Sequence, residues 1–527
     1  MSTSSTNVVG IDLGTTFSAI ATLDDRGQAT TIPNREGEML TPSVVLLDEG
    51  GAIVGQPARE VALELPDRVA SLIKRSMGYS QYPRPLMGRD FRPETLSAII
   101  LRKLISDAEL RIGPISKAVI TVPAYFDDTR RKATQDAGRI AGLEVVDIID
   151  EPTAAALAYS FQEPHGGGPS VLSMGISETQ TVLVYDLGGG TFDVALVRLA
   201  PRRFETLGVD GDVLLGGRDW DERIVEYVAR KFIETHGSDP RTDPQAAETL
   251  SEAAERAKKT LGKLSQANIT CTHAGKVLTV SFTRAEFESI TKDLLMRTRL
   301  TTQQVLKQAG ISWSDVDRIL MVGGSTHMPM TSNMLQNLTG KVPDRTLAVS
   351  EVVARGAAIH AGIVTARENK GNQSSGLASD LQDVLEQVIE INVISHSLGI
   401  EIKLNDERVN DILVPKNRQL PTAASRVYKT VVENQPQVRV KVLQGEAPQA
   451  DACISIGECW IEGLPPDLPK KSPIQVRCSV GSNGMIDVMA LDMTSGKMVQ
   501  TEIHRSSGLS EDEIAKEAEW VRQLTVQ

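Results

Sequence analysis

The chain has 527 residues, of which 41% are apolar and 24% charged, with a formal net charge of −12 and a pI near 5.3. This length predicts roughly three or four folding units, and the acidic balance argues against a general nucleic-acid-binding protein. The sequence shows no basic, apolar leader and no apolar run long enough for a bilayer, so we expect a soluble, cytoplasmic protein that binds neither nucleic acid nor membrane.

Residues 7–366 alternate apolar, strand-like runs with helix-like segments. Helices are predicted at 127–141, with Asp127 as N-cap, and at 221–235. Alternation of this kind predicts an α/β fold, which we take as a first domain. The predicted strands are at residues 8–11, 118–122, 181–185 and 318–322.

The composition changes after this domain. Residues 366–380 are polar and rich in Gly and Ser, and we assign 367–392 as an interdomain linker. From residue 393 to 506 the apolar period becomes two, with turns at Asn483-Gly484 and 494–497, which predicts a compact all-β domain. Residues 507–527 end the chain with a short helix, where Ser510 and Glu513 form a capping box.

Two related loops carry the strongest chemical signal: residues 10–16 read GIDLGTT, and residues 186–193 read DLGGGTFD. Glycines let backbone N–H groups approach phosphate oxygens, a Thr hydroxyl adds a donor, and the Asp at the strand end can hold Mg²⁺ directly or through water. Two such loops would clamp one triphosphate from both sides, and no Walker A motif is present. One loop alone could be a plain tight turn; two copies, each behind a strand, favour a nucleotide site.

A third glycine loop, residues 323–326 with the sequence GGST, also follows a predicted strand. Its glycines would let the backbone approach an adenine or a ribose. Taken alone, the same residues could equally make an ordinary strand-to-helix turn.

These loops, together with residues 122–126, 137–143, 150–156 and 442–446, resemble the seventy-kilodalton heat-shock chaperone family, from about residue 7 to 510. The resemblance implies an α/β actin-like ATPase domain of duplicated ribonuclease H type, followed by an all-β sandwich that binds peptides. It also implies ATP or ADP with Mg²⁺ as the ligands, and hydrolysis of ATP. The chain looks like a short member of the family that lacks the helical lid.

The resemblance assigns roles to residues of the first domain. Lys74 would stabilise the γ-phosphate and orient the attacking water, and Asp186 or Asp193 would accept the proton, because phosphoryl transfer depends on positioning and charge neutralisation. Without the resemblance, Lys74 would pass as a solvated charge, and Glu255 with Lys258 as a surface ion pair. The matched catalytic positions are Lys74, Glu151, Asp186, Thr191 and Asp193; the Mg²⁺ positions are Asp12 and Asp186, through water; and the relay to the partner domain is Pro123 and Arg131. The matched nucleotide contacts are Gly14, Thr15, Thr16, Gly188, Gly189, Gly190, Gly217, Glu255, Lys258, Lys259, Gly323, Gly324, Ser325 and His327.

In the second domain the matched peptide-pocket positions could equally be ordinary core. As a groove they would bury roughly one to three apolar side chains of an extended peptide, with weak to moderate affinity. ATP would act as an allosteric effector, with loose peptide binding in the ATP state and tight binding in the ADP state. J-domain co-chaperones and nucleotide-exchange factors are the implied partners of a chain that we expect to be a monomer. The pocket positions are Ile400, Tyr428, Val431, Val438 and Val440.

The sequence also departs from the family pattern. The short helix predicts poor trapping of peptide and a fast off-rate. His327 stands where the family usually has an Arg against the adenine, which predicts weaker nucleotide affinity, and residues 348–351 read AVSE in place of Asn-Pro-Asp-Glu. Glu390 interrupts an apolar linker that docks onto the ATPase domain in the family, which raises the question of how strongly the domains are coupled. Lys403 stands where a family member carries an apolar side chain that arches over the bound peptide.

Three functions remain open at this point. The first is an ATP-gated peptide-binding chaperone. The second is a nucleotide-dependent regulatory or scaffold protein that holds one dedicated partner, which the short helix and altered linker motivate. The third is a small-molecule kinase on the same actin-like fold, which would transfer phosphate to an acceptor rather than to water. A filament-forming actin relative would leave the β domain unexplained.

Overall fold

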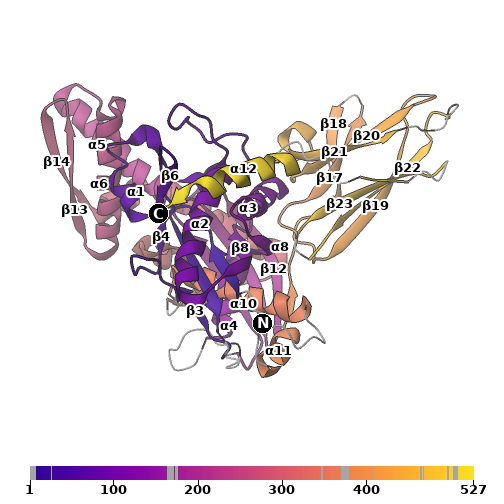
Figure 1. The fold of residues 1–527 in the computed structure, drawn as a ribbon, viewed down its shortest axis with the longest axis horizontal. Helices are drawn as coiled ribbons and strands as arrows, with labels where there is room; N and C mark the ends of the chain where they lie inside the picture. The colour runs from indigo at the N-terminus through magenta and orange to yellow at the C-terminus, as the bar shows by residue number, and fades with distance from the viewer. Residues whose placement is uncertain are drawn as a thin grey trace.

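The computed structural model of the chain places an α/β body and a β-sandwich side by side (Figure 1). Three predicted segments are described only in part. The residues that lie outside the description are 483 of one turn, 495–497 of the other, and 369–378 of the polar segment 366–380. The described residues are 7–24, 26–162, 171, 176–345, 348–368, 379–405, 407–462, 464, 466, 468–482, 484–494, 498–501 and 508–527.

The first sheet of the α/β body contains the strands predicted at residues 8–11 and 118–122. Its members are β1 (Asn7–Asp12), β2 (Phe17–Leu23), β3 (Ala29–Ile32), β4 (Thr41–Pro42), β8 (Ile115–Val122) and β9 (Glu144–Asp150). The strand order is β3-β2-β1-β8-β9, and β4 pairs with β2. β1 is antiparallel to β2 and parallel to β8, so the loop after β1 is the turn of a hairpin.

The second sheet repeats this arrangement with the strands predicted at residues 181–185 and 318–322. Its members are β10 (Gln180–Leu187), β11 (Phe192–Ala200), β12 (Arg203–Asp212), β15 (Arg318–Val322) and β16 (Ile389–Ile391). The order is β15-β10-β11-β12-β16, with β10 antiparallel to β11 and parallel to β15. The second glycine loop is therefore also the turn of a hairpin. This internal repeat agrees with the expected duplication.

Both predicted helices form. The first is α3 (Asp128–Ile140), where the Asp127 carboxylate accepts from the amide of Arg130, and Gly142 follows with φ +94°. The second lies within α5 (Gly217–His236), which begins four residues earlier than predicted because Asp219 closes a capping box on the amide of Gly216.

Two helices join the sheets into one body. α4 (Glu151–Ser160) and α10 (Val352–Glu368) pack on each other, α4 against β10 and β11 and α10 against β1 and β2. The outer faces are covered by α2 (Pro93–Ile112), α3, α5 and α8 (Lys292–Ala309), while α6 (Pro244–Lys263) packs on α5 and on the hairpin of β13 (Gln266–His273) and β14 (Lys276–Thr283). The hairpin turns of the two sheets therefore face a common cleft.

The second domain is a sandwich of two antiparallel sheets, which confirms the all-β prediction. Val440, Val442, Val476 and Cys478 alternate with outward residues and fill its core. One sheet has the order β18-β17-β20-β21 and the other β19-β22-β23-β24. Their bounds are β17 Leu398–Leu404, β18 Glu407–Val414, β19 Thr422–Lys429, β20 Gln437–Gln444, β21 Ile454–Glu462, β22 Pro473–Val480, β23 Ile486–Asp492 and β24 Met498–Thr501.

The two domains are docked. After α11 (Ser379–Glu386), the linker strand β16 pairs in parallel with β12 and so becomes the edge of the second sheet. Direct contacts also cross between the domains, where Lys416 pairs with Asp210 at 2.9 Å and His396 Nε2 lies 3.0 Å from the Tyr125 carbonyl oxygen.

The predicted C-terminal helix, α12 (Glu511–Gln523), packs on α2 and α3 of the α/β body (Figure 1). Ser510 and Glu513 form the predicted capping box, and Ile514 and Val521 are buried. β25 (Thr525–Val526) then pairs with β6 (Gly51–Val54) in the small sheet β25-β6-β5-β7, where β5 is Val45–Asp48 and β7 is Val69–Ala70. Within the described part of the chain, no helix is both long and apolar enough to cross a membrane.

Candidate nucleotide site

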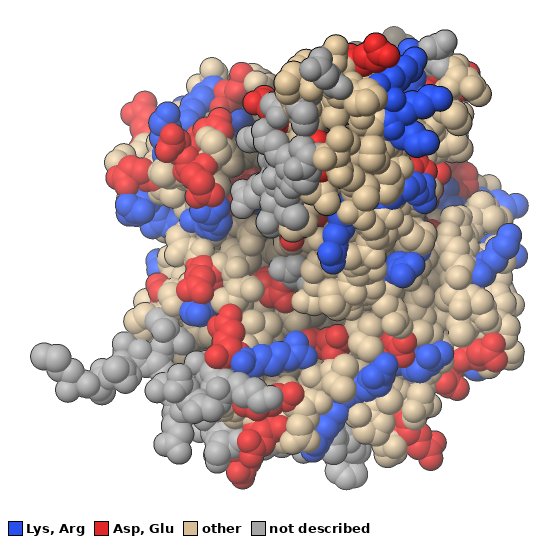
Figure 2. All heavy atoms as spheres, turned by 90° about the vertical axis from the view of Figure 1, so that its right-hand side faces the viewer, with Lys and Arg blue, Asp and Glu red and all other residues tan. Residues whose placement is uncertain are grey.

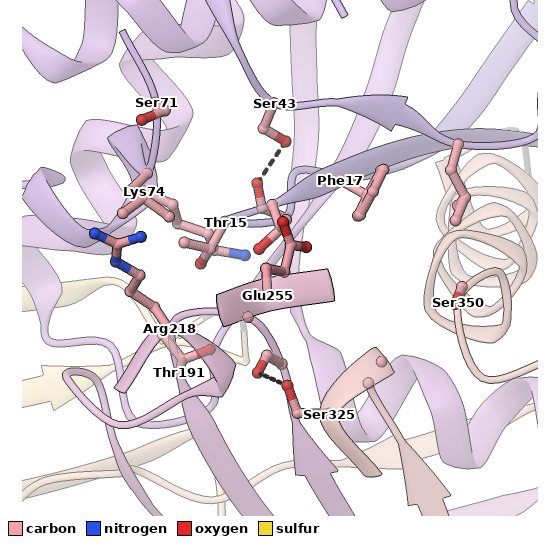
Figure 3. Close-up of a pocket in the computed structure, with 18 of the residues that line it drawn as sticks. Thr15, Phe17, Ser43, Ser71, Lys74, Thr191, Arg218, Glu255, Ser325 and Ser350 are labelled. Atoms are coloured by element: carbon pink, nitrogen blue, oxygen red, sulfur yellow. Dashed lines mark hydrogen bonds between the residues drawn. The ribbon is translucent and has the colours of Figure 1, made fainter. Parts of the chain in front are cut away.

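A cavity of about 340 Å³ lies in the cleft between the two lobes of the α/β body (Figure 3). Glycine loops from both sheets meet there. The predicted site residues that line it are Asp12, Gly14, Thr15, Thr16, Lys74, Glu151, Asp186, Gly188, Gly189, Thr191, Glu255, Lys258, Lys259, Gly323, Gly324 and Ser325. Most of the residues predicted to contact a nucleotide are therefore brought together.

The two hairpin loops approach each other so closely that only glycine fits in the second. A Cβ on Gly189 would lie 1.8 Å from Thr16 Oγ1, and a Cβ on Gly190 would lie 2.4 Å from Thr15 Cγ2. The first loop is fixed from its own lobe, because Ser43 Oγ donates to the Gly14 carbonyl oxygen at 2.8 Å. The result is a cradle of backbone and Thr hydroxyls of the kind that binds phosphate.

An acidic centre lies at the floor of the cavity, around Lys74. The Lys74 ammonium forms an ion pair with Glu151 Oε1, and both side chains are almost fully buried. Thr121 Oγ1 donates to Asp12 at 3.1 Å, and the Tyr125 amide donates to Asp193 at 3.1 Å. Lys74 lies among four carboxyl groups, of which Glu151, Asp186 and Asp193 are buried and Asp12 is half-buried.

Burial and mutual repulsion raise the pKa values of Asp12, Asp186 and Asp193. Burial, reinforced by the charge of Glu151, raises the pKa of Asp12 to about 7. The same two causes hold the pKa values of Asp186 and Asp193 well above their usual range. Burial acts to lower the pKa of Lys74, but Glu151 and Asp12 outweigh it and raise that pKa.

This excess of buried acid fits a bound divalent cation, which would relieve the repulsion. In the described residues, no group of three or more His, Cys, Asp or Glu side chains converges closely enough to hold a metal ion by itself. Asp12 and Asp186 are the carboxyl groups that would hold such a cation, through water.

Four of the residues predicted for catalysis or nucleotide binding do not line the cavity. Asp193 is buried, and Gly190 and Gly217 let the backbone come close to the Thr15 and Ser325 side chains, where a Cβ would clash. His327 is exposed at the end of the turn η6 (Gly324–His327) and does not itself line the cavity, although Gly324 and Ser325 of the same turn do. Its position against an adenine stays a prediction. Val349 and Ser350 of the altered segment 348–351 do line the cavity.

Sequence reasoning missed the contacts of several charged residues at the cleft. Lys258 pairs with Asp221 at 2.8 Å rather than with Glu255, and Lys259 pairs with Glu255 at 2.8 Å. Arg59 of α1 (Gln56–Glu60) also pairs with Glu255 and so bridges the two lobes above the cavity. Lys258 and Asp221 are 37 residues apart in the sequence, and Arg59 and Glu255 are 196 residues apart, so no local spacing could reveal these two pairs.

The two positions predicted to relay between the domains, Pro123 and Arg131, lie between this site and the sandwich. Arg131 pairs with Asp150 at 2.5 Å, next to Glu151, and also donates to the carbonyl oxygens of Phe126 and Ala124. Pro123 accepts from the amide of Phe126 in the turn after β8. Arg131 further borders a small crevice shared with Asn392, Val393 and Gln444 of the linker and sandwich.

The five predicted peptide positions lie in three environments. Ile400 and Val440 are buried in the sandwich core, as the core interpretation predicted, and Tyr428 and Val438 are half-buried against it. Val431 is 63% exposed. The Tyr428 hydroxyl donates to Asp411 at 2.8 Å, which fixes the ring. Figure 2, viewed from the sandwich end, shows Lys and Arg interspersed with Asp and Glu, with uncharged residues between them.

An actin-like body with opposed glycine loops over a buried acidic centre, docked through its linker onto a β-sandwich, defines a class of two-domain ATPases. The Hsp70 protein family model matches residues 8–87 and 81–525. Two relatives, each named chaperone protein DnaK, come from two strains of Halobacterium salinarum; each is 39% identical over 517 residues, which are 97% of this chain and 77% of the relative. The chain belongs to the Hsp70 family, and it is an ATPase and an ATP-dependent molecular chaperone.

Proposed function

We propose that ATP hydrolysis in the cleft gates the binding and release of extended apolar peptide segments by the sandwich. One observation carries this proposal: the linker strand β16 pairs with β12, in the same sheet whose β10–β11 turn is the second glycine loop. A movement of that loop on hydrolysis would therefore be transmitted through β11 and β12 to the linker strand. We assign residues 7–366 to the ATPase domain, 367–392 to the linker, 393–506 to the peptide-binding sandwich and 507–527 to a short helical segment.

The chemistry follows from the charges around the cavity. Thr15, Thr16 and Thr191, with the loop amides, would hold the phosphates of ATP, and Lys74 would offset charge on the γ-phosphate. Water would attack the γ-phosphorus, and the bond to the bridging oxygen of ADP would break. Asp186 or Asp193 would accept the water proton, which suits their raised pKa values. Mg²⁺, held by Asp12 and Asp186 through water, would supply further charge neutralisation.

Unfolded or extended apolar peptides are the proposed clients, with a J-domain protein and a nucleotide-exchange factor as partners. Single-turnover ATP hydrolysis, with and without an unfolded apolar peptide, tests the coupling. We expect peptide to accelerate wild-type hydrolysis, Lys74→Ala to be inactive and Lys276→Ala, on the distant β13–β14 hairpin, to match the wild type. Hydrolysis that ignores peptide would contradict the proposal and favour the dedicated-partner function; phosphate transferred to an acceptor would favour the kinase.

A further inference from the structure

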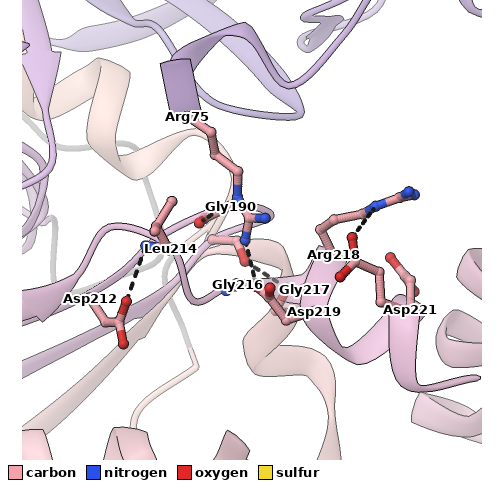
Figure 4. Close-up of polar contacts among 12 residues, drawn as sticks. Arg75, Gly190, Asp212, Leu214, Gly216, Gly217, Arg218, Asp219 and Asp221 are labelled. Atoms are coloured by element: carbon pink, nitrogen blue, oxygen red, sulfur yellow. Dashed lines mark hydrogen bonds and ion pairs between the residues drawn. The ribbon is translucent and has the colours of Figure 1, made fainter. Parts of the chain in front are cut away.

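Arg75 follows Lys74 on the turn η2 (Ile73–Ser76), but its side chain reaches the opposite lobe (Figure 4). Arg75 Nε donates to the Gly190 carbonyl oxygen at 3.0 Å, and Nη2 pairs with Asp219 Oδ2 at 2.5 Å. The side chain is only 17% exposed. Two adjacent residues of one turn thus have different targets. Lys74 contacts the acidic centre, and Arg75 contacts the second glycine loop.

The contact with Gly190 belongs to a set that orients this loop. The Gly188 carbonyl oxygen accepts from the Gly217 amide at 2.9 Å and from Ser325 Oγ at 2.8 Å, and the Gly189 carbonyl oxygen accepts from the Arg218 amide at 2.9 Å. Three consecutive carbonyl groups are therefore tied back. Two are held from the loop's own lobe, and the third is held by Arg75 from across the cleft.

The group that Arg75 grips is itself rigid. Asp219 Oδ2 also accepts from the Gly216 amide at 2.7 Å, in the capping box of α5. Gly216 packs so tightly on the loop that a Cβ there would lie 2.5 Å from the Gly190 amide nitrogen. A planar guanidinium can contact a carbonyl and a carboxylate at once in a fixed geometry, which an ammonium group cannot reproduce.

We propose that Arg75 is a positioning residue for ATP hydrolysis, which fixes the second glycine loop relative to Lys74 when the lobes are closed. The proposal rests on the assignment of the cavity as the ATP site. Arg75 does not line the cavity, so it acts through the Gly190 carbonyl and Asp219 rather than by touching the nucleotide. Without Arg75, Lys74 and the loop would each keep their other contacts, but their separation across the cleft would no longer be fixed.

The test compares Arg75→Ala, Arg75→Lys and Asp219→Asn with the control Arg68→Ala, whose exposed pair with Asp48 lies on the same lobe. Three quantities are measured: the single-turnover rate at saturating ATP, the Kd for ATP, and amide hydrogen exchange of residues 188–191 without nucleotide. For Arg75→Ala we expect the rate to fall about 10- to 100-fold, more than the affinity, because small misplacements are costly in positioned reactions. Exchange of residues 188–191 should quicken, Arg75→Lys should recover only part of the rate, and Arg68→Ala should match the wild type.

A wild-type rate in Arg75→Ala would overturn the proposal, as would a slow rate with unchanged exchange in residues 188–191. Should Arg75→Ala fail to melt cooperatively, Arg75→Lys and Asp219→Asn decide, since both retain a polar partner; wild-type behaviour in both would overturn it. The two proposals can fail separately. If the wild type does not hydrolyse ATP, the assignment of the site is refuted. If Arg75→Ala hydrolyses ATP at the wild-type rate, only the positioning role of Arg75 is refuted.

Discussion

His360 Nδ1 lies 2.8 Å from Glu390 Oε1, so the charge in the linker strand is paired inside the docked structure. His360 Nε2 lies 2.8 Å from Asp147 on the other side of the ring, and Arg367 lies 3.6 Å from Glu390 Oε2. The Glu390 and His360 side chains are 6% and 7% exposed. Glu390 thus has specific partners on the ATPase domain, and docking of β16 buries it in a matched site.

Glu390→Gln should weaken linker docking, because it leaves a buried His360 with one carboxylate in place of two. Breaking a buried pair usually costs about 3–5 kcal/mol, and we expect about 2 kcal/mol here since Asp147 remains. Hydrogen exchange of the Ile389 amide, which donates to the Arg202 carbonyl oxygen, should quicken, and peptide stimulation of hydrolysis should fall. The exposed Asp383→Asn is the matched control. Full protection of Ile389 in Glu390→Gln would contradict this prediction.

The same site predicts a pH dependence. Burial acts to lower the pKa of His360, but Glu390 and Asp147 outweigh it and raise that pKa to about 10. A raised pKa contributes stability that is complete below the ordinary value of about 6.5 and is lost as pH rises through the folded value. Docking of the linker should therefore weaken as pH rises from about 7 to 10. The measurement is the hydrogen-exchange protection of β16, corrected for the pH dependence of intrinsic exchange. His360→Gln combined with Glu390→Leu should remove this dependence; an unchanged slope would refute the assignment.

The strands, the glycine loops and the change to a β domain could be predicted because their signals are local. Apolar runs, a period of two and Asp-Gly-Thr turns depend on neighbouring residues, and β1, β10 and the sandwich formed where those patterns occur. The resemblance supplied the role of Lys74, which its surrounding sequence did not distinguish from a surface charge.

The cross-chain pairs could not be predicted in this way. Glu390 reads as a charge in an apolar linker, and its partner His360 lies 30 residues earlier on a buried helix face. Arg59 and Arg75 reach residues 196 and 144 positions away. Alternation placed Val440 on one face of a strand and the resemblance singled out Ile400, but neither could say whether these side chains line a groove or fill the core.

Arg59→Ala should speed nucleotide release, because Arg59 bridges the lobes to Glu255 above the cavity. The pair is partly exposed, so we expect about 1 kcal/mol or less, which is at most roughly a fivefold faster rate. Stopped-flow release of fluorescent ADP measures it, and raised salt should shrink the difference between wild type and variant. Arg68→Ala is the control, and an unchanged release rate would show that the bridge does not hold the cleft closed.

Trp520→Ala should loosen α12 from the ATPase domain. The Trp520 and Phe91 ring centroids are 5.6 Å apart, and the Arg89 guanidinium lies 4.9 Å from each ring. Fully buried Trp→Ala changes cost about 3–5 kcal/mol, and we expect about 2 kcal/mol for this half-buried ring.

Hydrogen exchange along α12 measures this loosening, with Glu519→Ala on the exposed face of the same helix as control. Because β25 continues from α12 and pairs with β6, the amide of Gln527, which donates to the Ala52 carbonyl oxygen, should lose protection with the helix. Protection of Gln527 that persists while α12 exchanges freely would show that the strand is anchored independently and that the helix does not hold it in place.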